Sequence, residues 1–165
     1  MSSIDILLII TPLTAGEERD NLKYMSNSGR KRLNWAETAM KLAYNIADYR
    51  SEDPYIQVGA CIIKKDKSML LGYNGAPSGI NIDWSDRDLR RKKVLHAEAN
   101  VLNFVKPNEV ELLACTHIPC VECLKVIAQK KIKEVYFSEF LENYNSDSTI
   151  EMAEEFGINL IHMRV

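Results

Sequence analysis

The chain has 165 residues, of which 46% are apolar and 27% charged, and its formal net charge is −2. These values are typical of one globular domain, and a pI near 6.0 argues against a dedicated nucleic-acid-binding protein, which usually has a basic surface. No apolar run approaches the roughly 20 residues that span a bilayer, and the longest, residues 6–10, lacks the basic flank of a secretory signal. The composition therefore predicts no membrane segment.

Residues 1–33 are predicted to form an extension that precedes the main domain. Residues 4–10 are apolar and are compatible with an edge strand of the sheet or with a contact to a neighbouring subunit. Residues 14–32 are rich in Gly, Asn and Ser, a composition that is typical of a loop or a flexible arm. The two interpretations of the apolar stretch stay open at this point.

Residues 34–165 carry the helix and strand signals of a single domain. Apolar residues at three- and four-residue steps predict a first helix after Asn34, which ends in the polar segment 51–54. Two strands are predicted next, at 56–63 and 69–73, with a polar turn between them.

A long loop, predicted over residues 74–93, separates these elements from the second half of the domain. Loops of this length in compact domains are usually functional or disordered. Helices are then predicted at 96–104, 120–130 and 149–156, and strands at 110–116, 135–138 and 158–162. This order implies a mixed five-stranded sheet with helices on both faces.

One motif carries most of the chemical information. It consists of His96-Ala97-Glu98 and, further along the chain, Pro119-Cys120-Val121-Glu122-Cys123. A catalytic zinc site has three protein ligands and leaves a fourth position for water, whose pKa falls to about 7. Both parts of the motif lie at the start of a predicted helix, where residues three apart share a face. We therefore expect His96, Cys120 and Cys123 to bind one zinc ion.

Glu98 distinguishes a catalytic zinc site from a structural one. A structural zinc ion normally has four protein ligands, and the other candidates, His117, His162 and Cys115, lack the usual spacing. Taken alone, Glu98 would be an ordinary first-turn glutamate that the helix dipole favours. Within the motif it is expected to move a proton from water to the substrate. The pattern H-x-E…P-C-x-x-C is that of zinc nucleobase deaminases, and it predicts hydrolytic deamination.

The other two cysteines, Cys61 and Cys115, lie inside apolar strand-like runs. A free cysteine in such a run behaves as a small hydrophobic residue. We therefore expect buried thiols without a disulfide and a reducing, cytoplasmic location.

Four stretches of the domain resemble one known family. They are Gln57–Ala60, Gly72–Gly79, His96–Asn100 and Pro119–Cys123, and over about residues 34–165 the chain resembles the deoxycytidylate (dCMP) deaminase family of the cytidine deaminase superfamily. The zinc motif is common to the superfamily, whereas the glycine-rich stretch Gly72–Gly79 indicates the dCMP branch. The resemblance implies a cytidine deaminase-like three-layer α/β/α fold and hydrolysis of dCMP to dUMP, which supplies thymidylate synthesis.

The resemblance also implies roles for individual residues. It makes His96, Cys120 and Cys123 the zinc ligands and Glu98 the proton shuttle.

For the substrate, the resemblance implies three contacts. Asn74 would bind the nucleotide through the sugar, the backbone N–H of Ala97 would hold the pyrimidine O2, and Gln57 would lie near the phosphate. On residue type alone, Asn74 is equally a turn residue, since Asn-Gly is a turn dipeptide. Position 56 is Ile where many family members carry Ser or Thr, which weakens the phosphate contacts expected there.

The charged run at residues 86–93 has two interpretations. It is a solvated face, or one of Arg87, Arg90 and Arg91 reaches a substrate or effector phosphate. Residues 74–95 contain no cysteine or histidine for a second, structural zinc ion, so one zinc ion per chain is expected.

The resemblance further implies regulation by dCTP and dTTP, with Mg²⁺ as a companion of the effector, and a homo-oligomer built from dimers, up to a hexamer. Two alternatives to dCMP deamination stay open. One is a deaminase of another ring or of nucleic acid, such as tRNA adenosine or guanine. The other is a non-catalytic, zinc-stabilised interaction module.

Overall fold

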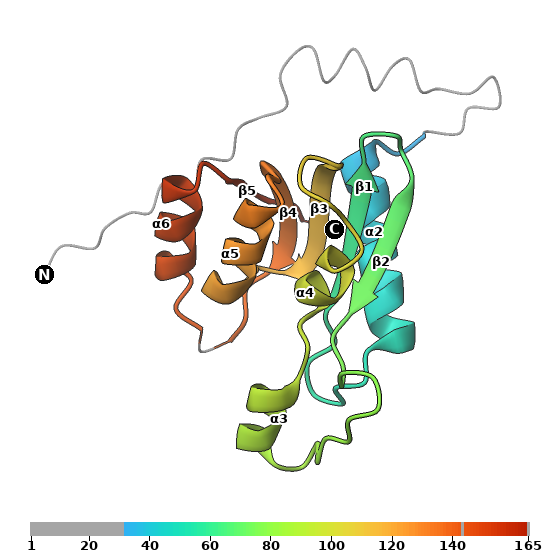
Figure 1. Ribbon diagram of the computed structural model, residues 1–165, viewed down its shortest axis with the longest axis vertical. Helices are drawn as coiled ribbons and strands as arrows, with labels where there is room; N and C mark the ends of the chain where they lie inside the picture. Colours follow the sequence, from blue (N-terminus) through green and yellow to red (C-terminus); the bar gives the residue numbers. More distant parts are fainter. Residues whose placement is uncertain (1–31, 143, 165) are drawn as a thin grey trace, which may run out of the picture. The chain divides into compact units, whose positions relative to one another are not determined.

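The computed structural model describes residues 32–142 and 144–164. Its elements, in chain order, are α2 (Trp35–Arg50), β1 (Gly59–Lys64), β2 (Met69–Tyr73), α3 (Arg87–Lys93), α4 (Ala97–Leu102), β3 (Val110–His117), α5 (Val121–Gln129), β4 (Glu134–Glu139), α6 (Asp147–Glu155) and β5 (Asn159–His162) (Figure 1). The extension predicted for residues 1–33 lies outside the described residues except for its last two. Its strand or arm therefore stays a prediction.

The five strands form one mixed sheet in the order β2-β1-β3-β4-β5 (Figure 1). Strand β1 pairs antiparallel with both β2 and β3, whereas β3, β4 and β5 run parallel. The β1–β2 pair is the predicted hairpin. The parallel pairs need crossover connections, and α5 and α6 supply them. The mixed five-stranded sheet predicted from the sequence is confirmed.

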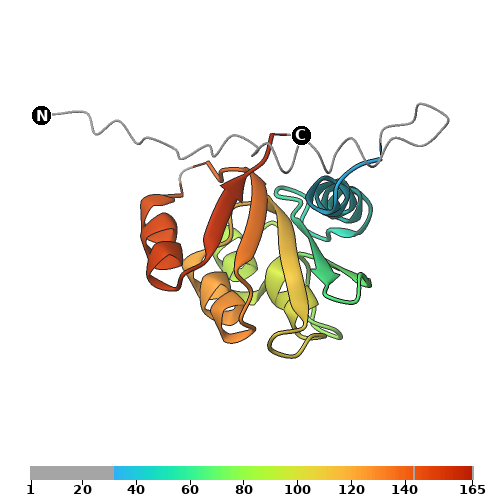
Figure 2. The ribbon, with the colours of Figure 1, turned by 90° about the horizontal axis from the view of Figure 1, so that it is seen from above.

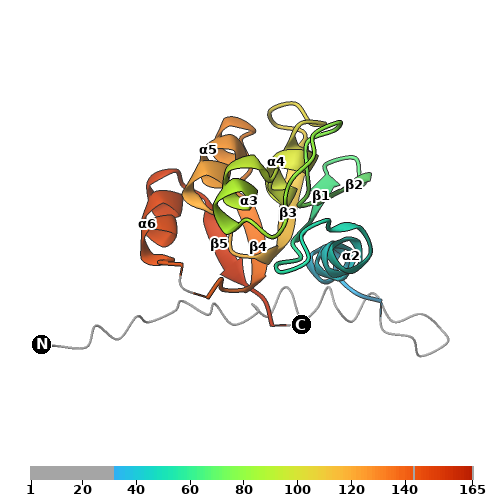
Figure 3. The same cartoon turned by 90° about the horizontal axis from the view of Figure 1, so that it is seen from below.

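Helices cover both faces of this sheet. Because side chains alternate along a strand, β1 sends Cys61 and Ile63 to one face, where they pack against Met40 and the alanines of α2. It sends Ala60 and Ile62 to the other face, against α4 and α5. Figures 2 and 3 show α2 across the sheet from α4 and α5. The three-layer α/β/α architecture is confirmed.

Strand β1 is shorter than predicted, because it begins at Gly59 and not at residue 56. One backbone hydrogen bond, from Asn74 N–H to the Val58 carbonyl oxygen at 3.1 Å, reaches residues 56–58, and side chains hold the rest of this backbone. The amide of Asn74 accepts a hydrogen bond from Val58 N–H at 2.8 Å and donates one to the Ile56 carbonyl oxygen at 2.8 Å. Strand periodicity gives no sign of this arrangement.

The predicted loop at 74–93 contains a helix, α3, that the sequence pattern did not predict. No residue of α3 is buried, so the helical periodicity of apolar residues is absent. Its signal is the N-cap, where the Asp86 carboxylate accepts hydrogen bonds from Asp88 N–H and Leu89 N–H, both at 2.9 Å. An N-cap aspartate is among the strongest local helix-start signals.

Cys61 and Cys115 are free and fully buried. They belong to the two clusters on opposite faces of the sheet, and burial raises the pKa of the Cys61 thiol to about 12. The predicted buried thiols are confirmed. Between residues 32 and 164, leaving out 143, no helix is both long enough and apolar enough to cross a membrane.

Candidate active site

Two helix N-termini bring the motif residues together. His96 is the N-cap of α4 and Cys120 the N-cap of α5, while Cys123 lies in the first turn of α5 and is buried. The close approach of α4 to the sheet depends on Gly72 in β2. A Cβ atom at Gly72 would lie 2.5 Å from the carbonyl oxygen of Ala97, so only glycine fits beneath the start of α4.

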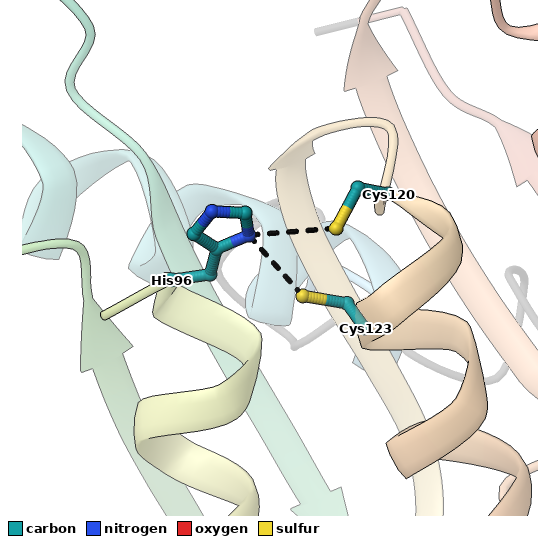
Figure 4. A group of neighbouring side chains, drawn as sticks. All are labelled: His96, Cys120 and Cys123. Atoms are coloured by element: carbon teal, nitrogen blue, oxygen red, sulfur yellow. Dashed lines mark hydrogen bonds between the residues drawn. The ribbon is translucent and has the colours of Figure 1, made fainter. Parts of the chain in front are cut away.

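His96, Cys120 and Cys123 point toward one another across the gap between α4 and α5 (Figure 4). The Nδ1 atom of His96 lies 3.5 Å from Cys120 Sγ and 3.4 Å from Cys123 Sγ. A tetrahedral zinc ion with Zn–S near 2.3 Å and Zn–N near 2.05 Å would place such atoms about 3.6 Å apart. The ligand atoms therefore already have the spacing of a zinc site.

No fourth ligand joins this group among the residues that the structure describes, since the cluster of possible metal ligands holds these three side chains alone. The three alternatives are engaged elsewhere. His117 contacts Thr116 and Glu139, a ring nitrogen of His162 lies 2.9 Å from the Ser138 carbonyl oxygen, and Cys115 is buried. Three ligands with a free fourth position are typical of a catalytic zinc site.

The three side chains of the cluster shift one another's pKa values. A hydrogen bond from the Cys123 side chain, reinforced by His96, lowers the pKa of Cys120 to about 4. The same hydrogen bond to Cys120, together with burial, raises the pKa of Cys123. Cys120 raises the pKa of His96. A bound cation would favour the thiolate form of both cysteines and the neutral form of His96.

Glu98 lies beside the cluster without being part of it. Its side chain is buried, at 4% exposure, and its carboxyl group interacts with His96 and with the Cys123 side chain. Burial raises the pKa of this carboxyl group, against the opposing effect of the His96 charge. A buried carboxyl group with a raised pKa is suited to both accept and donate a proton near neutral pH.

A pocket of about 850 Å³ opens over this group, and its lining includes His96, Ala97, Glu98 and Cys120. Ala97 is the first residue of α4, so its N–H lies outside the intrahelical hydrogen-bond pattern. Gln57 also lines the pocket, and its side-chain amide donates to the Asp53 carbonyl oxygen at 2.7 Å.

Asn74 lines the same pocket but uses its amide to hold the chain. Besides its bonds to residues 56 and 58, its Oδ1 accepts a hydrogen bond from the Ser51 hydroxyl at 2.6 Å. One amide hydrogen is left for a ligand. The substrate contacts predicted for Asn74, Ala97 and Gln57 stay predictions, since they concern a bound nucleotide.

A second polar group at the pocket was missed in the sequence. The Tyr44 hydroxyl donates to Glu139 at 2.5 Å, and His117 lies 3.5 Å from the same carboxylate. Burial lowers the pKa of His117, and Glu139 partly opposes the shift. Tyr44 and Glu139 are 95 residues apart in the chain, so no local pattern could link them.

Comparison with known proteins identifies the family to which the chain belongs. Residues 33–139 match the model of the cytidine and deoxycytidylate deaminase zinc-binding region. The chain belongs to the cytidine and deoxycytidylate deaminase family. The resemblance seen in the sequence is thereby confirmed, and the chain is by class a hydrolytic deaminase.

Curated and structural relatives support this assignment. An uncharacterized deaminase of Aliivibrio fischeri is 36% identical over 118 residues, which cover 68% of this chain and 78% of the relative. Human deoxycytidylate deaminase is also 36% identical over 118 residues, covering 64% of this deaminase and 65% of the human enzyme. The dCMP deaminase of cyanophage S-TIM5, solved with dCMP and dUMP, is 27% identical with a TM-score of 0.63, and the match covers 80% of this chain and 100% of the phage chain.

Proposed function

We propose that this deaminase hydrolyses dCMP to dUMP and ammonia and so supplies dUMP for thymidylate synthesis. The observation that carries the proposal is the convergence of His96, Cys120 and Cys123 with the buried Glu98 at one pocket. The choice of dCMP is supported by the glycine-rich stretch Gly72–Gly79, by the human relative and by the nucleotides bound to the phage enzyme.

The metal of this site is a zinc ion, one per chain in our proposal, held by His96 Nδ1 and the two sulfur atoms. Its chemistry is that of a Lewis acid that lowers the pKa of a bound water to about 7. The observed nitrogen–sulfur spacing and the nitrogen and sulfur donors fit this ion, whereas a hard cation would prefer oxygen ligands.

The chain's own groups then handle the protons and the ring. Glu98 accepts a proton from the attacking water and delivers it to N3 of cytosine. It then takes the proton of the hydroxyl group now on C4 and passes it to the amino group, so that ammonia leaves and the C4 carbonyl of dUMP forms. The Ala97 N–H holds the pyrimidine O2, and Asn74 faces the sugar. Burial of Glu98 supports this role, because a carboxyl group shielded from solvent exchanges protons with the substrate in preference to bulk water.

The test replaces Glu98 by Gln, which keeps the shape of the side chain and removes its proton transfer. We expect turnover of dCMP, measured as ammonia release, to fall by about 10²- to 10⁴-fold, while zinc content stays near one per chain. The matched control is Glu122→Gln in the same motif. Glu122 is exposed and pairs with Lys125 at 2.6 Å, so this variant loses the same charge without loss of turnover.

Near-wild-type activity of Glu98→Gln would contradict the assigned proton transfer. A chelator that removes zinc should abolish turnover, and added zinc should restore it. A protein that releases no ammonia from any base would be the non-catalytic module. Release from a tRNA stem-loop or from guanine, but not from dCMP, would identify one of the other deaminases.

Regulation and assembly belong to the same proposal. A hollow of about 510 Å³ is lined by Gly75, Ala76 and neighbouring residues, next to the stretch where the family resemblance implies effector binding. We propose that two effectors, dCTP with Mg²⁺ and dTTP, bind in this hollow. We also propose that the protein forms a homo-oligomer. Turnover of dCMP with and without each effector, and the mass in solution, test both statements.

A further inference from the structure

The charged run that the sequence left with two interpretations has a defined arrangement in the structure. Helix α3 carries five basic residues, Arg87 and the run from Arg90 to Lys93, and they do not all lie on the same face. Arg87, Arg90 and Arg91 lie at positions i, i+3 and i+4, which share one face of a helix, and all three line the pocket that holds Glu98. Lys92 and Lys93 are exposed and lie outside its lining.

Arg90 is already engaged by protein groups. Its Nε lies 3.4 Å from Asp53 Oδ2, and the two side chains are only 12% and 6% exposed. The guanidinium group also lies over the ring of Tyr55, 4.3 Å from its centroid, and donates to the Trp84 carbonyl oxygen at 3.2 Å. The charge of Arg90 is therefore neutralised, and its donors are directed at the protein.

Asp53 joins this arginine to the segment before β1. Its second oxygen, Oδ1, accepts hydrogen bonds from Tyr55 N–H at 2.9 Å and from Ile56 N–H at 3.2 Å. One buried carboxylate thus links α3 to residues 53–57, the segment whose other end is held by Asn74. The Asp53–Arg90 pair fixes where α3 stands relative to the pocket.

Arg87 and Arg91 remain. Both are exposed, and neither pairs with a carboxylate within residues 32–142 and 144–164. The nearest acidic residues of α3 itself do not compete: Asp86 caps the helix, and Asp88 is not part of the pocket lining. The pocket therefore presents two unneutralised guanidinium groups on one helix face.

We propose that Arg87 and Arg91 bind the 5′-phosphate of the nucleotide and that Asp53 and Arg90 position them. The proposal rests on the proposed function and names the residues that distinguish a nucleotide from a nucleoside. A guanidinium group contacts phosphate through two parallel hydrogen bonds, which suits a phosphate monoester with its charge of almost −2. Gln57, predicted near the phosphate, lies on the segment that Asp53 ties to α3, because it donates to the Asp53 carbonyl oxygen.

The test compares two double variants with the same change of charge on the same helix. Arg87→Gln/Arg91→Gln removes the proposed phosphate ligands, and Lys92→Gln/Lys93→Gln is the matched control outside the pocket lining. For the arginine variant we expect KM for dCMP to rise by about 10-fold or more per arginine with little change in kcat. Inhibition by dUMP should weaken by the same factor, while inhibition by deoxyuridine, which has no phosphate, should not.

The outcomes are separable. If the wild-type enzyme does not deaminate dCMP, the proposed function fails and the inference with it. If the wild-type enzyme does and the arginine variant keeps its KM for dCMP, the inference alone is wrong. Equal weakening by the lysine variant would show a general charge effect and would also overturn it.

Positioning by Asp53 has its own readout. Asp53→Asn keeps the Oδ1 acceptor for the two backbone N–H groups and removes the charge that Arg90 needs. We expect a rise in KM for dCMP and in the inhibition constant of dUMP, with kcat and the inhibition constant of deoxyuridine almost unchanged. A purely structural role for the pair would instead weaken inhibition by dUMP and by deoxyuridine equally, or lower kcat alone.

Discussion

The fit between β2 and α4 gives the sharpest prediction. Replacing Gly72 by Ala places a Cβ atom 2.5 Å from the Ala97 carbonyl oxygen and 2.8 Å from Val101 Cβ. A carbon–oxygen contact is comfortable at about 3.3 Å, so the start of α4 must move by about 0.8 Å. The atoms in the way belong to the backbone and to a buried residue, and they cannot rotate aside. Overpacking of this kind costs about 1–3 kcal/mol.

The same shift is expected to affect catalysis, because α4 carries Glu98, the proposed proton shuttle, and follows its N-cap His96, a proposed zinc ligand. A displacement near 1 Å in an active site can cost about 10²-fold in rate. For Gly72→Ala we therefore expect a melting temperature lowered by about 2–10 °C, a kcat for dCMP lowered by about 10- to 100-fold, and weaker zinc retention in dialysis against a chelator.

Gly157→Ala is the matched control. Gly157 has φ +63° at the end of α6, and its Cβ would meet only Lys133 Nζ at 3.6 Å, so the substitution strains the backbone without moving α4. It should cost about 1–2 kcal/mol and leave kcat unchanged. If Gly72→Ala kept full kcat and full zinc content, or if Gly157→Ala lost as much activity, the reasoning would be refuted.

Two further predictions concern groups at the pocket. Asn74→Ala removes three side-chain hydrogen bonds to residues 51, 56 and 58. The free energy of unfolding should therefore fall by about 1–3 kcal/mol in thermal unfolding, and KM for dCMP should rise. An unchanged melting temperature would contradict the role of Asn74 in holding these segments. Burial lowers the pKa of His117 in the folded chain, so the unfolded state binds more protons below about pH 6.5 and the wild type loses stability there as pH falls. The His117→Gln variant should lose less stability than the wild type between pH 8 and 5.5 in thermal unfolding. An identical loss in both proteins would show that the pKa of His117 is not lowered by folding.

The sequence predicts the chemical reaction more completely than it predicts how the substrate is bound. The zinc motif is local: His96 and Glu98 are two residues apart, and Cys120 and Cys123 share one helical turn, so the residue types and spacing suffice to predict a metal and a proton shuttle. The order of the other helices and strands follows equally from periodicity, since they bury apolar side chains at helical or strand spacing. The structure adds that the two groups of predicted ligands lie at the N-termini of α4 and α5.

The elements that the sequence analysis missed are those with no buried apolar face. Helix α3 is capped by Asp86 and exposes every turn, so its existence depends on a polar cap and on the Asp53–Arg90 pair, which periodicity does not detect. The segment 56–58 has a strand-like composition, yet most of its backbone hydrogen bonds go to the side chains of Asn74 and Asp53 and not to a strand partner. In both cases polar side chains, and not an apolar face, hold the backbone: Asp86 caps α3, and Asn74 holds residues 56–58.

The proposed catalytic residues and the pocket wall near α3 are held in place by different kinds of contact. The proposed catalytic residues rest on α4 and α5, where a shift is opposed by buried side chains such as Val101 and Leu124. The pocket wall formed by α3 and residues 53–57 is held by one buried ion pair and a few hydrogen bonds. Substitutions in that wall disturb little of the core, so they should alter which nucleotide binds without altering the deamination chemistry. A change in substrate preference is therefore expected from Asp53, Arg87 and Arg91, and a loss of turnover from Gly72, His96 and Glu98.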